Sequence, residues 1–135
     1  MAERVQFELV TPERLLLSEM VEMVVVPGTE GNFGVLPGHA PLITELAVGE
    51  ITFRNGAEEQ KLAVAWGFAE VLPDRVTILA ETAERPSEID VERARKAKER
   101  AEKLLTSGDP NVDVERALAA QKKAETRLEV AGKNP

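Results

Sequence analysis

The chain has 135 residues, no cysteine and a formal net charge of −7. The length fits one domain or two very small ones, and the lack of cysteine excludes disulfides and thiol catalysis. No apolar run approaches the roughly 20 residues that direct membrane insertion needs. Residues 1–83 hold 5 Lys/Arg against 13 Asp/Glu and residues 84–135 hold 12 against 11, so we expect no nucleic-acid binding and expect an anionic partner to meet the second part.

Short apolar–polar alternations fill the first 83 residues and predict strands. Asn55-Gly56 is a strong hairpin signal because both residues accept positive φ. We interpret Trp66-Gly67-Phe68 as a bend between two strands. This spacing predicts an antiparallel β-sandwich or flattened barrel of about ten strands over residues 1–84. The clearest strand segments are residues 5–9, 15–17, 20–27, 33–36, 42–46, 50–54, 61–65, 69–72 and 75–80.

The stretch from Gly34 to Leu42 is the corner around which these strands are arranged. It is too rich in Gly and Pro for a helix and too apolar for a solvated loop. Its His39 is the only histidine of the chain, and we interpret this residue as structural rather than catalytic.

The pattern changes at Pro86, and residues 85–135 predict a helix-turn-helix hairpin, which makes the fold class α+β. Asp90 is a suitable cap for a helix to about residue 105, and a second helix is expected over residues 113–130. The pentapeptide DVERA occurs at the start of both helices, as two similar caps or as a duplicated binding unit. The expected apolar stripes are mostly alanine, which buries little surface, so we infer that the hairpin can dock on the sandwich or lift away.

No catalytic constellation is visible in the sequence. His39 has no Ser or Cys motif beside it, and the glycines at 28, 31 and 34 do not have the spacing of a phosphate loop. The carboxylates lie mainly on alternating strand positions, and no metal-ligand spacing is present. We therefore predict no catalytic residue, no metal site and no required cofactor.

Several motifs together resemble one known family. Residues 33–42 (FGVLPGHAPL) resemble the signature loop of the epsilon subunit of bacterial F-type ATP synthase. Residues 66–71 (WGFAEV) and 76–80 (VTILA) resemble its strand pair, although the family usually has Gly in place of Trp66. Residues 83–85 and the helical hairpin extend the resemblance over essentially the whole chain.

The resemblance implies a non-catalytic rotor subunit in the central stalk of the proton-translocating enzyme. Its β-sandwich would grip the gamma subunit and touch the c-ring, and its hairpin would fold down or extend along the shaft and inhibit ATP hydrolysis. Such a subunit lies at the cytoplasmic face of the bacterial inner membrane as a peripheral part of the complex. The gamma and c-ring contact is expected at Glu30, Gly31, Asn32 and His39, and some members carry an acidic residue in place of Asn32.

The resemblance also suggests ATP as a regulatory ligand of the folded-down hairpin. Residues 89–94 fit the Ile/Leu-Asp-x-x-Arg-Ala motif of the ATP-binding members in full. Lys123 and Arg127 stand where those members carry two Arg, and Lys123 keeps the charge without the bidentate fork of a guanidinium. The ATP-binding residues expected are Glu84, Ile89, Asp90, Arg93, Ala94, Lys123 and Arg127.

An extended hairpin would instead offer its basic residues to acidic surfaces of the alpha/beta catalytic head. Two other readings stay open: a free-standing nucleotide-responsive module and, less favoured, a β-sandwich enzyme. Co-purification with gamma separates the rotor subunit from the free module. The residues expected to contact the catalytic head are Arg93, Arg95, Lys96, Arg100, Lys122 and Lys123.

Overall fold

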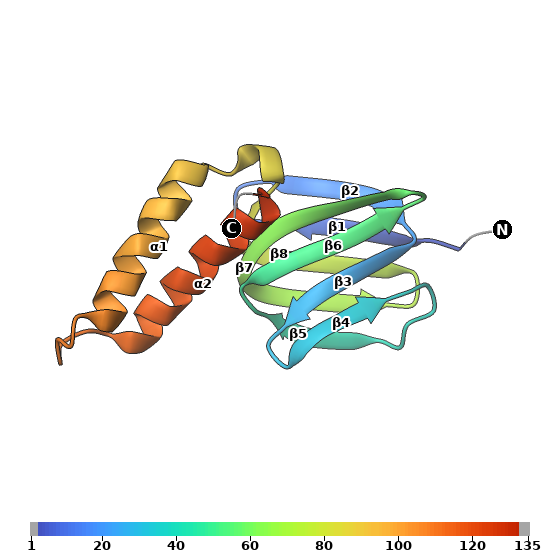
Figure 1. The fold of residues 1–135 in the computed structure, drawn as a ribbon. Coiled ribbons are helices and arrows are strands. Elements are labelled where there is room, and N and C mark those ends of the chain that lie inside the picture. Colours follow the sequence, from blue (N-terminus) through green and yellow to red (C-terminus); the bar gives the residue numbers. More distant parts are fainter. Residues whose placement is uncertain (1–2, 133–135) are drawn as a thin grey trace.

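A β body and a helical hairpin lie side by side in the computed structural model, which describes residues 3–132 (Figure 1). The expected outer limits of the two domains, at residues 1 and 135, lie outside the described residues. The strands are β1 (Val5–Val10), β2 (Leu15–Val21), β3 (Met23–Gly28), β4 (Gly31–Val35), β5 (Leu42–Leu46), β6 (Gly49–Asn55), β7 (Glu58–Leu72) and β8 (Arg75–Glu84), and the helices are the short η1 (Pro86–Glu88), α1 (Val91–Thr106) and α2 (Val114–Val130).

The strands form one sheet that folds over on itself around a core. Their order is β2-β1-β8-β7-β5-β3-β4, and β6 pairs with both β3 and β7. Every pair is antiparallel except β1 with β8, which is parallel. The two largest core side chains, Phe7 and Phe53, meet edge to face with ring centroids 5.2 Å apart. The β-sandwich prediction is confirmed.

The strand number is a correction: the described residues hold eight strands, not about ten. The segments at 61–65 and 69–72 belong to one strand, β7, whose first part pairs with β6 and whose second part pairs with β5. The expected bend at Trp66-Gly67 does not end the strand, because Ala65 pairs with Thr82 and Gly67 with Ala80 in an unchanged register while Trp66 has no partner in the ladder. The pairing of β7 with β8 is therefore interrupted for one residue and then continues.

The first boundary between strands also differs from the prediction. Met20 and Val21 complete β2, and the next strand begins at Met23 after a bend at Glu22. The bend changes which side of the chain faces inward, so β3 buries Val24 and Val26.

The hairpin begins and ends close to where the sequence predicts. Asp90 accepts a hydrogen bond from the backbone N–H of Arg93, and Asp113 accepts one from that of Arg116. The repeated DVERA segment therefore forms two N-caps of the same kind. The stripes between the helices are mostly alanine, as expected. Their buried members are Ala94, Ala101, Ala117, Ala124 and Leu128.

Part of the predicted apolar stripe lies outside the seam. Leu104, Val114 and Leu118 are each about half exposed, at 50%, 54% and 49%. They lie near the turn between the helices, at the end of the hairpin that points away from the sheet in Figure 1. These three residues of the expected stripes stay partly exposed, because the body does not reach this end of the hairpin.

The hairpin contacts the body through a small apolar cluster and through charged side chains of α2. α2 lies against β6 and β7, and α1 packs on the far side of α2 (Figure 1). The cluster consists of buried Ala63, Ile89 and Val130, with Val91 and Ala131 packed against it. No helix of the described residues is long and apolar enough to cross a membrane.

Candidate functional site

A groove opens where the end of β8 meets both helices of the hairpin. Its volume is about 240 Å³. Arg93, Ala97 and Arg100 share one face of α1 by their i, i+4, i+7 spacing, and Arg127 enters from α2. Three guanidinium groups therefore converge on one space, which suits a ligand with several anionic oxygens. We call this space the arginine groove, and its lining residues are Glu84, Asp90, Arg93, Ala94, Ala97, Arg100 and Arg127.

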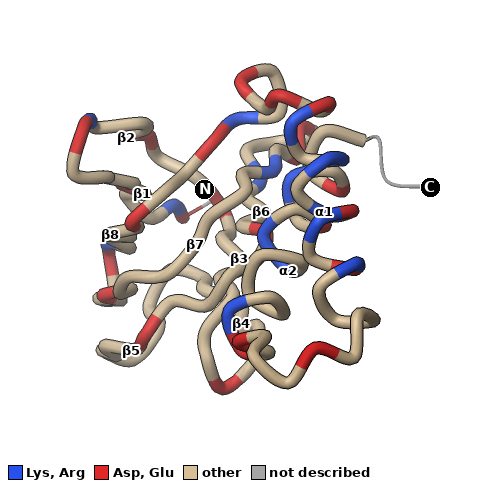
Figure 2. Tube along the Cα trace, turned by 90° about the vertical axis from the view of Figure 1, so that its left-hand side faces the viewer, with Lys and Arg blue, Asp and Glu red and all other residues tan. Residues whose placement is uncertain are grey.

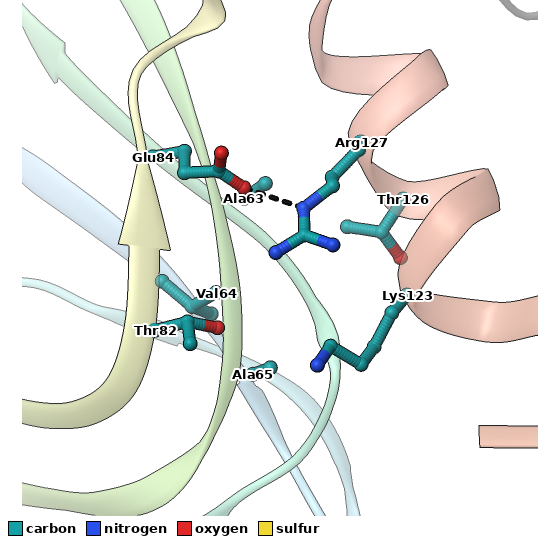
Figure 3. Close-up of a pocket in the computed structure, with 8 residues that line it drawn as sticks. All are labelled: Ala63, Val64, Ala65, Thr82, Glu84, Lys123, Thr126 and Arg127. Carbon is teal, nitrogen blue, oxygen red and sulfur yellow. Dashed lines mark hydrogen bonds and ion pairs between the residues drawn. The ribbon is translucent and has the colours of Figure 1, made fainter. Parts of the chain in front are cut away.

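Arg127 connects the arginine groove with the body. Its Nε donates a hydrogen bond to Glu84 Oε1 at 2.5 Å, and both side chains are about 30% exposed. Figure 3 shows this pair above a small pocket of about 10 Å³, which is room for one water at most. The pair neutralises part of the positive charge of the empty groove, so an anionic ligand must compete with Glu84 for Arg127.

Two of the seven residues predicted to bind ATP lie elsewhere. Ile89 is buried in the apolar cluster under the hairpin. Lys123 turns toward the body, where its Nζ lies 5.0 Å from the ring centroid of Trp66. The other five line the arginine groove together. Sequence reasoning placed Arg100 only on the outer surface of the hairpin, although its spacing from Arg93 was a usable signal for the groove.

The basic residues expected to meet the catalytic head are mostly exposed in this docked hairpin. Figure 2 shows Lys and Arg gathered on the helices and Asp and Glu spread over the strands. Arg95 and Lys96 of α1 are exposed, and Arg95 pairs with Glu92 at 3.5 Å. Lys122 is exposed beside the sheet, whereas Lys123 is partly covered. Lifting the hairpin would therefore change the exposure of Lys123 more than that of the α1 residues.

The predicted gamma and c-ring contact divides into two places. Glu30, Gly31 and Asn32 lie at the start of β4, and Asn32 lines a crevice of about 460 Å³ that Lys122 of α2 also lines. His39 lies in the loop that follows the other end of β4, with its ring centroid 6.5 Å from that of Phe33. The two ends of β4 point to opposite sides of the body in Figure 1.

The body also has an apolar surface that sequence reasoning missed. Ile43, Phe68 and Leu79 are exposed at 71%, 54% and 52%. Phe68 pairs with Leu79 across β7 and β8 and with Glu45 across β5, so Ile43 is its diagonal neighbour. We call these three residues the outer apolar face. Apolar residues on the solvent side of an alternating strand were the available signal, and contiguous ones mark interaction surfaces.

The junction between body and hairpin is held by three charged residues that we call the junction strap: Arg14, Arg85 and Glu88. Arg14 and the backbone N–H of Arg85 donate to the Glu88 carboxylate at 2.8–3.0 Å, which holds the pKa of Glu88 below its ordinary value. The same bond to Glu88 raises the pKa of Arg14. Arg85 also donates a hydrogen bond to the carbonyl oxygen of Leu16 at 2.6 Å, so η1 is anchored to the body.

The described residues contain no group of three His, Asp or Glu side chains that could hold a metal ion. The groups that remain are a cationic groove, an apolar face and exposed basic helix surfaces. All three features are suited to binding.

Comparison with known proteins covers both parts of the chain. The model of the ATP synthase delta/epsilon chain β-sandwich domain matches residues 4–86, and that of the long α-helix domain of the same chain matches residues 87–132. The ATP synthase epsilon chain of Syntrophobacter fumaroxidans is 52% identical over 133 residues, covering 98% of this chain and 99% of its own. That of Koribacter versatilis is 57% identical over 110 residues, covering 82% and 78%.

Solved structures show the same fold. A chain in the Euglena gracilis mitochondrial ATP synthase, resolved with its OSCP, F1 and c-ring parts, matches with a TM-score of 0.71 and 27% identity over 96% of this chain and 78% of its own. A chain in the central stalk and c-ring of the Tetrahymena thermophila enzyme matches with a TM-score of 0.64 and 14% identity over 98% of both. This second likeness concerns the fold alone.

Proposed function

The chain belongs to the ATP synthase delta/epsilon chain family, and from that membership we propose that it turns with the rotor as a non-catalytic subunit of the central stalk. In this role it couples rotation of the c-ring to the catalytic head. It lies at the cytoplasmic face of the bacterial inner membrane and reaches the membrane only through its partners.

The observation that carries this proposal is the outer apolar face. An acidic body that leaves Ile43, Phe68 and Leu79 exposed side by side is suited to a large apolar partner surface with a basic rim. We assign this face to the gamma subunit. The residues around Glu30 and His39 remain predicted contacts at the two ends of β4.

A binding measurement with purified gamma tests the assignment. Phe68→Ser is expected to weaken binding at least tenfold, because exposed aromatic anchors carry much of the energy of an interface. Leu104→Ser is the matched control, since Leu104 is equally exposed but lies on the hairpin. Equal binding by the two variants would place gamma on another surface.

The second part of the proposal is regulation by ATP. The triphosphate binds in the arginine groove, whose walls come from β8, α1 and α2, and therefore stabilises the docked hairpin. Isothermal titration of the full chain with ATP, followed by NMR shifts on both helices, measures this directly. A flat response up to about millimolar ATP, which corresponds to about −4 kcal/mol, would remove ATP regulation but leave the stalk role intact.

The third part is inhibition by the extended hairpin. Its basic residues contact acidic surfaces of the alpha/beta head, so neutralising Arg95 and Lys96 together is expected to raise the ATP hydrolysis rate of the assembled enzyme. The variant Glu102→Gln, on the same helix, is the control for a change of helix charge without loss of a cation. Unchanged hydrolysis in the double variant would contradict this part.

A free-standing nucleotide-responsive module is the second candidate function. One observation favours it: Arg93, Arg100 and Arg127 of this chain line one groove, and three guanidinium groups suit a triphosphate. Affinity purification of the tagged chain separates the two. Recovery of gamma with it supports the stalk subunit, and recovery of a monomer that binds ATP supports the free module.

A further inference from the structure

Trp66 occupies an unusual backbone position. Its φ is 52°, in the left-handed region that bulky side chains rarely adopt. The next residue, Gly67, has a φ of 125°, and a Cβ there would lie 1.9 Å from the carbonyl oxygen of Leu79. This irregular backbone therefore lies where β7 and β8 approach closely at Gly67. Trp66 has no partner in the ladder, and its indole is partly exposed.

The indole has one charged neighbour from the other part of the molecule. Lys123 of α2 holds its ammonium 5.0 Å from the ring centroid, within the range of a cation–π contact. One helical turn further along α2, Arg127 pairs with Glu84. At the last turn, Val130 packs in the small apolar cluster. Three contacts thus follow one another along about 10 Å of α2.

The two charged residues Arg127 and Lys123 differ in whether they can also bind a ligand. Arg127 lines the arginine groove and is shared with any anion that enters it, whereas Lys123 lies outside that groove. The other charged residues lining the small pocket beside Lys123 are Glu84 and Arg127, and these two are already paired with each other. Lys123 is therefore committed to Trp66 in the docked state.

We propose that Trp66 and Lys123 form a clasp that holds the hairpin on the β body when the arginine groove is empty. The clasp is a regulatory contact built into this chain, because it joins a strained position of the body to the movable helix. It opposes lifting of α2 together with the apolar cluster, the Arg127–Glu84 pair and the attraction between Glu129 of α2 and Lys61 of β7. It does not depend on ATP binding.

The absence of cysteine from the chain makes a distance measurement direct. Asn111→Cys in the α1–α2 turn and Asp74→Cys in the β7–β8 turn place spin labels at exposed positions on hairpin and body. Pulsed electron spin resonance on the full chain without nucleotide gives the ratio of undocked to docked hairpin. A docked majority is expected, and a mainly undocked hairpin would overturn the proposal.

Lys123→Gln is expected to raise that ratio roughly two- to fivefold, the effect of losing one partly exposed cation–π contact. Lys123→Arg should restore docking, because a guanidinium also stacks on an indole. Lys103→Gln makes the same charge change on an exposed residue of α1 away from the body and should leave the ratio unchanged. Equal shifts in Lys123→Gln and Lys103→Gln would overturn the clasp.

A second variant, Trp66→Gly, tests the other partner of the clasp in the same spin-label experiment. Glycine adopts the positive φ without strain, so β7 keeps its backbone conformation while the indole is removed. The ratio should rise as far as in Lys123→Gln, and the double variant should add little beyond either single change. Additive effects of the two substitutions would show that the residues act separately and would overturn the proposal.

Discussion

The β body and the hairpin differ in what they bury. The body encloses one continuous core that includes Phe7, Leu9, Ile51, Phe53 and Ile78, all almost fully inaccessible to solvent. The hairpin is closed by alanines and fixed to the body by a cluster whose buried members are Ala63, Ile89 and Val130. Because apolar burial scales with side-chain size, most of the stability of the molecule resides in the body.

Because the body and the hairpin bury different amounts of apolar surface, the hairpin can undock while the body stays folded. A hairpin held by a few small contacts can lift without unfolding the sheet beneath it, since the core of the body makes no use of α2. The junction strap keeps η1 on the body, so the movable part begins after Glu88. The following predictions test whether the two regions respond independently.

The largest effect is expected in the body, at Gly67. Gly67→Ala places a Cβ against the backbone of Leu79 and forces a non-glycine residue to a φ of 125°, so we expect a loss of about 3–5 kcal/mol in the free energy of unfolding. Urea denaturation measures it. Gly56→Ala is the control, because Gly56 also has positive φ but open space around it, and it should cost about 1–2 kcal/mol. Equal losses would mean that β7 and β8 can move apart at Gly67 to accommodate the Cβ.

A smaller effect that is confined to the hairpin is expected at Ile89. Ile89→Ala removes a large side chain from the docking cluster and should weaken docking by about 2 kcal/mol while leaving unfolding of the β body nearly unchanged. Amide exchange, resolved between helix and strand residues, separates the two. Faster exchange in the strands as well would show that hairpin and body form one cooperative unit.

The parts of the fold that the sequence predicts are those that local chemistry decides. Asp90 and Asp113 each cap a helix by accepting a hydrogen bond from the backbone N–H three residues later in the chain. Both helix starts can therefore be predicted from the sequence. The inward direction of Ile51 and Phe53 follows from alternation alone. These features need no knowledge of what lies across the molecule.

The features that sequence reasoning missed depend on distant partners. The continuity of β7 through Trp66 rests on its pairing with β8, and Gly67 is interpretable only once Leu79 lies beside it. The resemblance predicts that Lys123 binds a phosphate, and the contact of its ammonium with Trp66 of the body depends on how the hairpin docks. The resemblance also predicts most residues of the arginine groove, and the packing of the helices adds Ala97 and Arg100 to them.

A third prediction compares Arg127 and Lys123 as ligands of ATP. Arg127→Gln removes a guanidinium from the arginine groove and leaves Glu84 uncompensated, so the dissociation constant for ATP should rise about tenfold. Lys123→Gln should change it less than about twofold, because Lys123 lies on Trp66 outside the groove. Isothermal titration of both variants measures the difference. If both variants raise the dissociation constant for ATP equally, Lys123 must leave Trp66 and contact the nucleotide when ATP binds.

The smallest effect concerns the junction strap and its dependence on pH. Because the folded state lowers the pKa of Glu88, its contribution to stability is complete above the ordinary carboxyl pKa of 4.5 and is lost as pH falls through the lower folded value. At neutral pH we expect Glu88→Gln to lower the thermal midpoint by about 1–3 °C, since the strap is exposed and screened.

The difference between wild type and Glu88→Gln should therefore shrink below about pH 4.5 and vanish in more acidic solution, as the wild-type carboxyl becomes protonated. Glu81→Gln, a carboxylate of β8 outside the strap, serves as the control in the same pH series. If the difference in thermal midpoint between wild type and Glu88→Gln persists unchanged in acid, the charge of Glu88 does not stabilise the junction. The junction would then be held by side-chain packing and not by the ion pair with Arg14.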